Sequence, residues 1–204
     1  MPQAVTVYRW DDPGAPQLTN RNIVEFITIL KKCLVEGYGD KEPLGWTLEY
    51  ENPAAFKAVF RNNAAAGGSG GYVQVNSSNG SNTSNIAFSL TPAKSMTGVD
   101  EFIQPGYRRN FGINTGWTNW LLIGTAIGFY FIAAQSSGSM AAFSQARENC
   151  AYVGDYISVP PADSGRFIVA AAFQTSGDST STTSNGASDL FVPDTQGGGS
   201  NFPS

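Results

Sequence analysis

WTNWLLIGTAIGFYFIAA, residues 117–134, is the most apolar stretch of the chain and the one that decides the fold. It is about as long as one membrane span, so a transmembrane helix is one interpretation. Glycines interrupt it, however, and a turn at 124–126 divides it into two apolar segments, 117–123 and 127–133. We expect these segments to be the paired, buried strands of a β-hairpin.

Other short segments of strand character, separated by polar turns, surround this hairpin in the sequence. They are residues 4–10, 46–51, 56–61, 72–75, 86–90, 151–158 and 166–174. Residues 97–116 look irregular. Alternation along the first segment places Val5 and Val7 on one face. Gly67–Gly71 predicts a flexible hairpin turn, because the lysine and the hydroxyl residue of a phosphate-binding loop are missing.

One segment near the N-terminus has helical rather than strand periodicity. Its apolar residues recur every three or four positions, and charged residues take the other side. The apolar positions are Ile23, Phe26, Ile27, Leu30, Cys33 and Leu34. Asn22 with Glu25 resembles a capping box, and Gly37 is placed to end the helix in a left-handed conformation. The sequence therefore predicts an amphipathic helix over about 22–36.

We expect residues 1–174 to form a single, mainly β domain, a barrel or sandwich with this helix packed on it. Residues 175–204 are rich in Ser, Thr and Gly and cannot bury enough surface to offset their ordering entropy. We expect a flexible extension there. In an assembly it would lie across a neighbour, with Leu190, Phe191 and Phe202 as candidate partner contacts, and the alternative is a disordered tail.

The composition excludes several kinds of chemistry. The chain of 204 residues has no histidine, which removes Ser-His-Asp and Cys-His catalysis and the commonest transition-metal ligand. Charged residues make up 14% and the net charge is −4, so we expect no specific binding of nucleic acid. Cys33 and Cys150 lack the spacing of a metal site, and we interpret both as reduced core residues. We expect neither a cofactor nor a metal.

Paired carboxylates of a glycosidase are the one enzymatic alternative that the composition leaves open. The candidates are Asp11, Asp12, Glu49, Glu51, Asp100, Glu101, Glu148 and Asp155. Glu49 and Glu51 would share one face of a strand, whereas the adjacent acids lie in turn-like sequence, where carboxylates are usually solvated. We therefore expect no catalytic residues and no enzyme.

The first fifty residues carry the most distinctive motifs. These are Val7-Tyr8-Arg9, Asp12-x-Gly14-Ala15-Pro16-x-Leu18, Cys33-Leu34-Val35-x-Gly37-Tyr38-Gly39-x-Lys41 and Gly45-Trp46-Thr47. Together with 54–56 and the strand motifs at 72–75, 120–123, 129–132 and 154–158, the pattern resembles a family of uncharacterised virion structural proteins of tailed bacteriophages. The resemblance covers residues 5 to about 174, and the loops of 63–85 depart from it. It implies a virion component without catalytic residues and leaves its position in the virion open.

This resemblance and the low charge favour a capsid decoration or cement protein that stabilises the phage head. The expected partners are the major capsid protein or other virion proteins and further copies of the chain, with no membrane involved. The expected location is the virion, assembled in the cytoplasm of the host bacterium. The alternatives are a tail, neck or baseplate component, or a host-surface module whose aromatic residues bind glycans.

Overall fold

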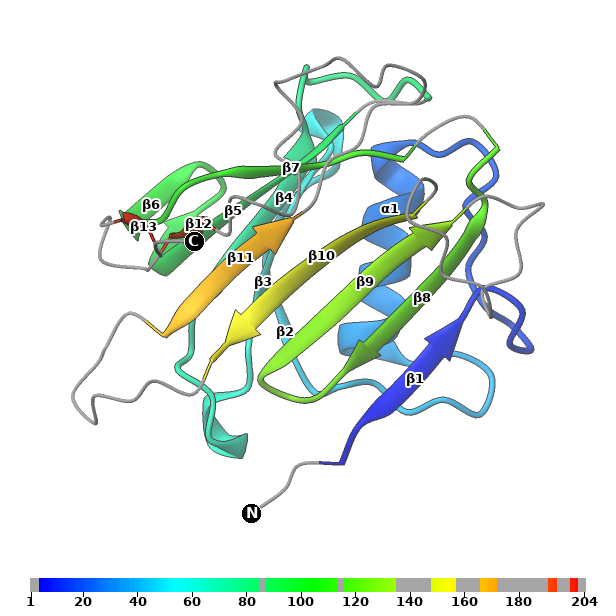
Figure 1. Ribbon diagram of the computed structural model, residues 1–204, viewed down its shortest axis with the longest axis horizontal. Coiled ribbons are helices and arrows are strands. Elements are labelled where there is room, and N and C mark those ends of the chain that lie inside the picture. Colours follow the sequence, from blue (N-terminus) through cyan, green and yellow to red (C-terminus); the bar gives the residue numbers. More distant parts are fainter. Residues whose placement is uncertain are drawn as a thin grey trace.

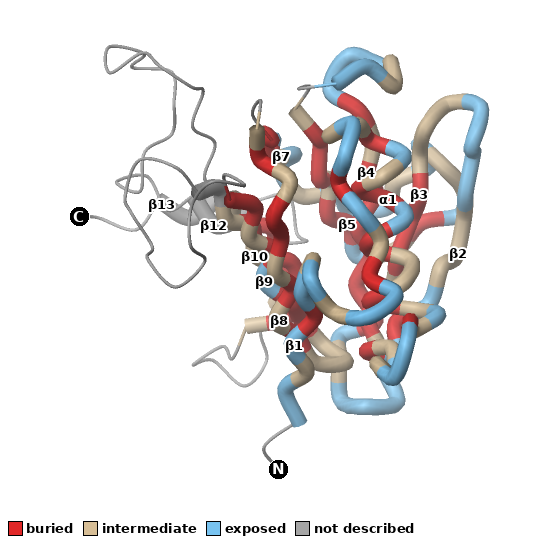
Figure 2. Tube along the Cα trace, turned by 90° about the vertical axis from the view of Figure 1, so that its right-hand side faces the viewer, coloured by how far each residue is buried: buried red, intermediate tan, exposed pale blue. Residues whose placement is uncertain are grey.

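A computed structural model gives the fold of the protein. It describes residues 4–84, 87–113, 116–134, 148–156 and 166–171, with the backbone alone for 148–149, and also the backbone of 191–193 and 199–201. Within these ranges the chain forms two large antiparallel sheets and one short helix near the N-terminus, which confirms the predicted mainly β class. The sheets are not closed into a barrel and they share one core, so the architecture is a sandwich (Figure 1, Figure 2).

The first sheet, sheet A, joins the first strand of the chain to strands from its second half. Its strands in spatial order are β1 (Thr6–Arg9), β8 (Asn119–Gly124), β9 (Gly128–Ala134), β10 (Glu148–Asp155) and β11 (Phe167–Ala171). β8 and β9 form the predicted hairpin, so the transmembrane interpretation of residues 117–134 is wrong. In the part of the chain that the structure describes, no helix has the length and apolarity needed to cross a membrane.

The second sheet, sheet B, is built from the middle of the chain. Its strands in spatial order are β2 (Thr47–Asn52), β3 (Lys57–Arg61), β4 (Tyr72–Ser77), β5 (Phe88–Gly98) and β6 (Glu101–Pro105), and β7 (Arg109–Phe111) also pairs with β5. The expectation that residues 97–116 are irregular is therefore wrong. β6 is largely exposed and lacks an alternating apolar pattern, and it forms because β5 is long enough to offer it a pairing partner. Two further short strands, β12 (Phe191–Pro193) and β13 (Gly199–Asn201), pair with each other.

The predicted helix is present as α1 (Ile23–Lys31), continued by one π-helical segment, Lys32–Glu36. The Asn22 side chain accepts a hydrogen bond from the Glu25 amide at 3.0 Å, as the capping box predicts. Gly37 ends the helix with φ 79° and ψ 171°, so the expected positive φ occurs, but the backbone is extended rather than left-handed helical. A Cβ here would lie 2.6 Å from the Lys41 carbonyl oxygen, which only glycine avoids.

The helix packs its apolar side between the two sheets, leaves its other side exposed, and joins the sheets through one aromatic cluster. The ring of Phe26 stacks on Phe88 of sheet B at 4.7 Å between centroids and meets Phe131 of sheet A edge-on at 4.9 Å. At the helix end, the backbone amides of Leu44 and Trp46 donate to the last helical carbonyls. Figure 2 shows the buried residues, in red, between the two layers.

Short three-residue helices occupy two connections of sheet B, Pro53–Ala55 between β2 and β3 and Ala64–Ala66 between β3 and β4. The second one leads into the Gly-rich loop. The sequence predicts a flexible turn there, but hydrogen bonds hold the loop in place. Ser69 donates from its amide (2.6 Å) and its hydroxyl (2.5 Å) to the buried carboxylate of Asp155 on β10, and Gly70 donates to the Asn62 side chain. The loop thereby fastens sheet B to sheet A.

Candidate functional site

The most unusual surface of the protein is the face of sheet A that points away from the shared core, here called the outer face. Strand alternation assigns its residues: the partners that face inward, such as Tyr8, Trp120 and Phe131, are fully buried. The outer-face residues are Val7, Arg9, Asn119, Leu121, Ile123, Gly128, Tyr130, Ile132, Ala134, Cys150, Tyr152, Gly154, Ile168 and Ala170. Sheet A is thus apolar on both faces, a pattern expected of a sheet covered on both sides.

The exposure of the outer face is greatest near β1 and at the centre of the sheet. Val7, Ile123, Tyr130, Tyr152 and Ala170 are in register across all five strands of sheet A. Tyr130 is 50% exposed and Val7 41%. Large apolar side chains on the surface of a soluble domain, when contiguous, indicate an interaction site.

Tyr130 and Tyr152 form the aromatic centre of the outer face. Their rings lie 4.7 Å apart between centroids. The Tyr152 hydroxyl donates to the Asp155 carbonyl oxygen, and burial raises the pKa of Tyr152 to about 12. A Cβ at Gly128 would lie 2.6 Å from that hydroxyl, so glycine at 128 leaves room for the ring. Tyr152 is therefore fixed in place, while Tyr130 projects from the sheet.

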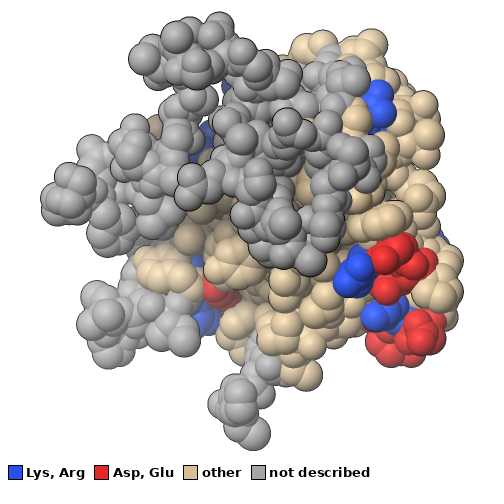
Figure 3. Space-filling view, turned by 45° about the vertical axis from the view of Figure 1, so that its right-hand side comes forward, with Lys and Arg blue, Asp and Glu red and all other residues tan. Residues whose placement is uncertain are grey.

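Charge is nearly absent from the outer face. Among the residues whose side chains the structure describes, Arg9 is the one charged member of this face, and its guanidinium pairs with Asp11 at 2.8 Å. The Arg9 hydrogen bond is the main reason that the pKa of Asp11 is lowered. In Figure 3, Lys and Arg side chains lie beside Asp and Glu side chains near the right margin, and the surface between them and the grey residues is mostly uncharged. Few of the side chains described on this face therefore carry a charge.

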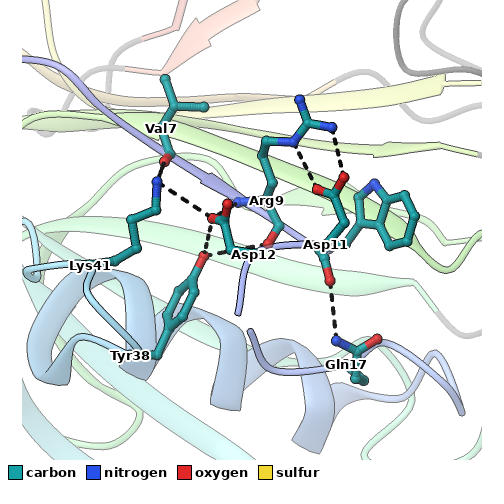
Figure 4. A network of polar contacts seen from close by, with 8 residues as sticks. Val7, Arg9, Asp11, Asp12, Gln17, Tyr38 and Lys41 are labelled. Atoms are coloured by element: carbon teal, nitrogen blue, oxygen red, sulfur yellow. Dashed lines mark hydrogen bonds and ion pairs between the residues drawn. The ribbon is translucent and has the colours of Figure 1, made fainter. Parts of the chain in front are cut away.

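The free edge of sheet A, along β1, is occupied by side chains from a turn and from the helix exit (Figure 4). Asp12 accepts hydrogen bonds from the Arg9 amide at 2.8 Å and from the Tyr38 hydroxyl at 2.9 Å. Lys41 donates to the Val7 carbonyl at 3.3 Å. Burial and the bond to Asp12 raise the pKa of Tyr38 well above its usual value. These contacts use the backbone groups that an added strand would need.

The opposite edge of sheet A, at β11, lies beside β5 and β7 of sheet B. Gly71 is packed so closely against this edge that a Cβ on it would come within 2.3 Å of the Phe167 ring. With both edges engaged, a partner can reach sheet A through the side chains of its outer face more readily than by strand addition.

The outer side of sheet B is organised differently, because the chain covers its apolar residues itself. Val59, Tyr72, Ala93 and Met96 are buried there in a second, small cluster beneath the β5–β6 hairpin. Asp100 at the hairpin turn binds Lys57 at 2.6 Å and accepts from Gln74 at 2.8 Å. No comparable cover of the outer face of sheet A exists among the described residues.

Each candidate carboxylate whose side chain is described has a hydrogen-bonding or ionic partner. Asp11 binds Arg9, Asp12 binds Tyr38, Glu49 binds Thr47, Glu51 binds Lys31, Asp100 binds Lys57, Glu101 binds Thr97, and Asp155 binds Ser69. The expected shared face of Glu49 and Glu51 is wrong, because a bulge between Leu48 and Tyr50 interrupts the alternation of β2. In the described ranges no group of three or more acidic or cysteine side chains is placed to hold a metal ion.

The remaining predicted residues have separate outcomes. Both cysteines are free; Cys33 is fully buried as expected, but Cys150 is partly exposed on the outer face, so its assignment to the core is wrong. Leu190 and Phe202 lie outside the described residues, and Phe191 begins β12, where the backbone alone is described. Their role as partner contacts, the domain span 1–174 and the flexibility of 175–204 stay predictions.

No family model, curated protein or solved structure matches the chain.

The sequence analysis did not predict the outer face, although the sequence contains a signal for it. The segments 117–123 and 127–133 are apolar at nearly every position, which predicts burial on both faces. That signal identifies a covered sheet but does not say whether the cover comes from the same chain. The arrangement offers a largely apolar, sparsely charged surface suited to packing against another protein surface.

Proposed function

We propose that this protein is a non-enzymatic structural component of a bacteriophage virion, most specifically a capsid decoration or cement protein that stabilises the head. The observation that supports it best is the largely apolar, sparsely charged outer face that extends over all five strands of sheet A. Such a face suits a permanent contact in an assembly, because permanent interfaces are more apolar than transient ones. The resemblance of the N-terminal motifs to virion proteins of tailed phages is the reason for proposing a phage virion as the assembly.

A rigid body is useful for this role. The helix, the aromatic cluster around Phe26 and the Asp155–Ser69 bonds tie the two sheets together. Force applied to the protein across a capsid seam would therefore be resisted by the whole sandwich. Binding that favours the assembled over the dissociated state stabilises the particle by mass action.

The glycan-binding alternative receives less support from the same surface. Sugar sites combine an aromatic platform with several polar groups that fix the hydroxyls. The outer face supplies the aromatic Tyr130, but the Tyr152 hydroxyl is already used by the Asp155 carbonyl. A protein partner fits this apolar surface better than a sugar does.

The decisive experiment is to measure the copy number of the chain in purified phage particles by quantitative mass spectrometry against the major capsid protein. A ratio near one, or a simple fraction of it, supports capsid decoration. A few copies per particle would move the protein to the tail, neck or baseplate. Absence from particles would overturn the proposal.

A further inference from the structure

We propose that Asn79, in the turn between β4 and β5, is a site of spontaneous modification, where the folded chain converts the side-chain amide to a carboxylate through a cyclic imide with Gly80. Both residues are exposed. They form one of two Asn-Gly pairs in the sequence, and the other, Asn185-Gly186, lies outside the described residues. The proposal goes beyond the virion role and does not depend on it.

The nucleophile of the reaction is the backbone nitrogen of Gly80. It loses its proton to a hydroxide ion and attacks Cγ of Asn79, and the new N–C bond closes a succinimide ring. The bond between Cγ and Nδ2 breaks, and the side-chain nitrogen takes a proton from water and leaves as ammonia. Water then adds to one imide carbonyl. Opening the ring at Cγ gives aspartate, and opening it at the backbone carbonyl carbon gives isoaspartate.

The turn holds the Asn79 side chain close to the nitrogen that attacks it. The Ser81 amide donates to Oδ1 of Asn79 at 3.0 Å, which is the hydrogen bond of an Asx-turn. Such a turn folds Cγ back toward the intervening peptide nitrogen, here that of Gly80. The Gly80 amide itself donates to the Ser77 carbonyl at 3.4 Å, a longer bond than usual that holds its proton weakly. The nucleophile is therefore close to Cγ and only lightly engaged.

Glycine at position 80 keeps the nitrogen accessible. Its φ is 75°, a backbone conformation that glycine adopts without strain. A Cβ at this position would have no described atom within 4 Å, so the surroundings are open to solvent. Water and hydroxide can therefore reach the Gly80 nitrogen from outside the turn.

Hydrogen-bond donors also surround the oxygen on which negative charge develops during the attack. Besides the Ser81 amide, the Ser81 hydroxyl donates to Oδ1 of Asn79 at 2.9 Å and the Ser77 hydroxyl donates at 2.8 Å. Preorganised donors around a developing oxyanion lower the barrier to attack on a carbonyl carbon. The fold thus activates Cγ of Asn79 as well as placing it beside the nucleophile.

The product changes the surface near the helix. The same loop contacts the first turn of α1, where the Val24 amide donates to Oδ1 of Asn82 at 3.2 Å. Conversion of Asn79 adds a negative charge to a chain whose net charge is −4, and isoaspartate also lengthens the backbone of the turn. We therefore expect aged protein to contain a more acidic species that ion exchange separates.

The test follows amide loss at Asn79 in the purified full chain, in mildly alkaline buffer, by peptide mapping with mass spectrometry. Mapping reads Asn79 separately from Asn185. The conversion should be at least about threefold faster in the native chain than in the same chain unfolded in urea, because only the fold supplies the turn and the donors. Its rate should rise with pH, because the Gly80 nitrogen must lose its proton.

Two variants show whether the donors are responsible. Ser81→Ala removes one donor to Oδ1 and should slow the native conversion about three- to tenfold, with no change in urea. Ser78→Ala, at an exposed position in the same turn, is the matched control and should leave both rates unchanged. Circular dichroism checks that both variants fold. A native rate at or below the rate in urea, or an unchanged native rate in Ser81→Ala, would overturn the proposal.

Discussion

The outer sides of the two sheets differ in how their apolar residues are covered. Sheet B folds its own β5–β6 hairpin over Val59, Tyr72 and Met96 and holds the hairpin with Asp100. Sheet A leaves Val7 and Tyr130 exposed, although its outer face is the more apolar of the two. The comparison teaches that covered apolar side chains contribute to folding, whereas apolar side chains that stay exposed are available for association. Mutations on the two sides should therefore be separable by what they change.

The largest expected effect on the unfolding free energy comes from mutations in the core that both sheets share. Such mutations should destabilise both sheets alike. Phe26→Ala removes the ring that contacts Phe88 of sheet B and Phe131 of sheet A, and should lower the free energy of unfolding by about 3–5 kcal/mol. Denaturant unfolding measures it. Val24→Ala on the exposed side of the same helix should change it by less than about 0.5 kcal/mol. A similar loss for both variants would contradict the central position of Phe26.

The next largest effect should come from the hydrogen bonds that link the Gly-rich loop to Asp155. Asp155→Ala leaves the Ser69 amide and hydroxyl without their acceptor and should cost about 1–3 kcal/mol. Thermal or denaturant unfolding gives the value, with Asp11→Ala as the control because Asp11 pairs with Arg9 on the surface. If Asp155→Ala costs no more than Asp11→Ala, the Gly-rich loop does not hold the sheets together.

The cover of sheet B should have a smaller effect, and one that depends on pH. Burial alone would raise the pKa of Asp100, but the hydrogen bonds from Lys57 and Gln74 outweigh it and lower the pKa below its ordinary 3.8. A lowered folded-state pKa stabilises the protein above pH 3.8, and this contribution disappears as the pH falls through the lowered value. Asp100→Asn should therefore cost about 0.5–1 kcal/mol at neutral pH.

The measurement for Asp100 is the difference in unfolding free energy between wild type and Asp100→Asn at several pH values. That difference should shrink steadily once the pH is below 3.8. A difference that stays constant with pH would mean that the charge of Asp100 does not hold the hairpin.

The exposed side chains on the outer face of sheet A should show the smallest effect on folding. Tyr130→Ser removes a side chain that is half exposed on the outer face, so the unfolding free energy measured at low concentration should change by less than about 0.5 kcal/mol. A large folding defect would mean that Tyr130 belongs to the covered core, and the contrast between the two sheets would fail.

Local patterns were sufficient for several elements because the interactions that form them are close in sequence. The 3.6-residue spacing of Phe26 and Leu30 and the Asn22 cap predict α1, and glycines in an apolar run predict the turn between β8 and β9. The mainly β class followed from the same patterns. Each of these depends on contacts within a few residues, which the order of amino acids states directly.

Tertiary structure alone decided which surfaces meet. β1 pairs with β8, more than a hundred residues later, and Ser69 binds Asp155 across the two sheets. β6 forms because β5 offers it a pairing partner. A bulge in β2 changes which face of the sheet the residues after Glu49 point to. The apolar character of residues 117–134 is written in the sequence, but which face of that hairpin the helix covers is not. That choice depends on packing between distant segments, because hydrophobic burial is non-directional and favours any arrangement that removes apolar area from water.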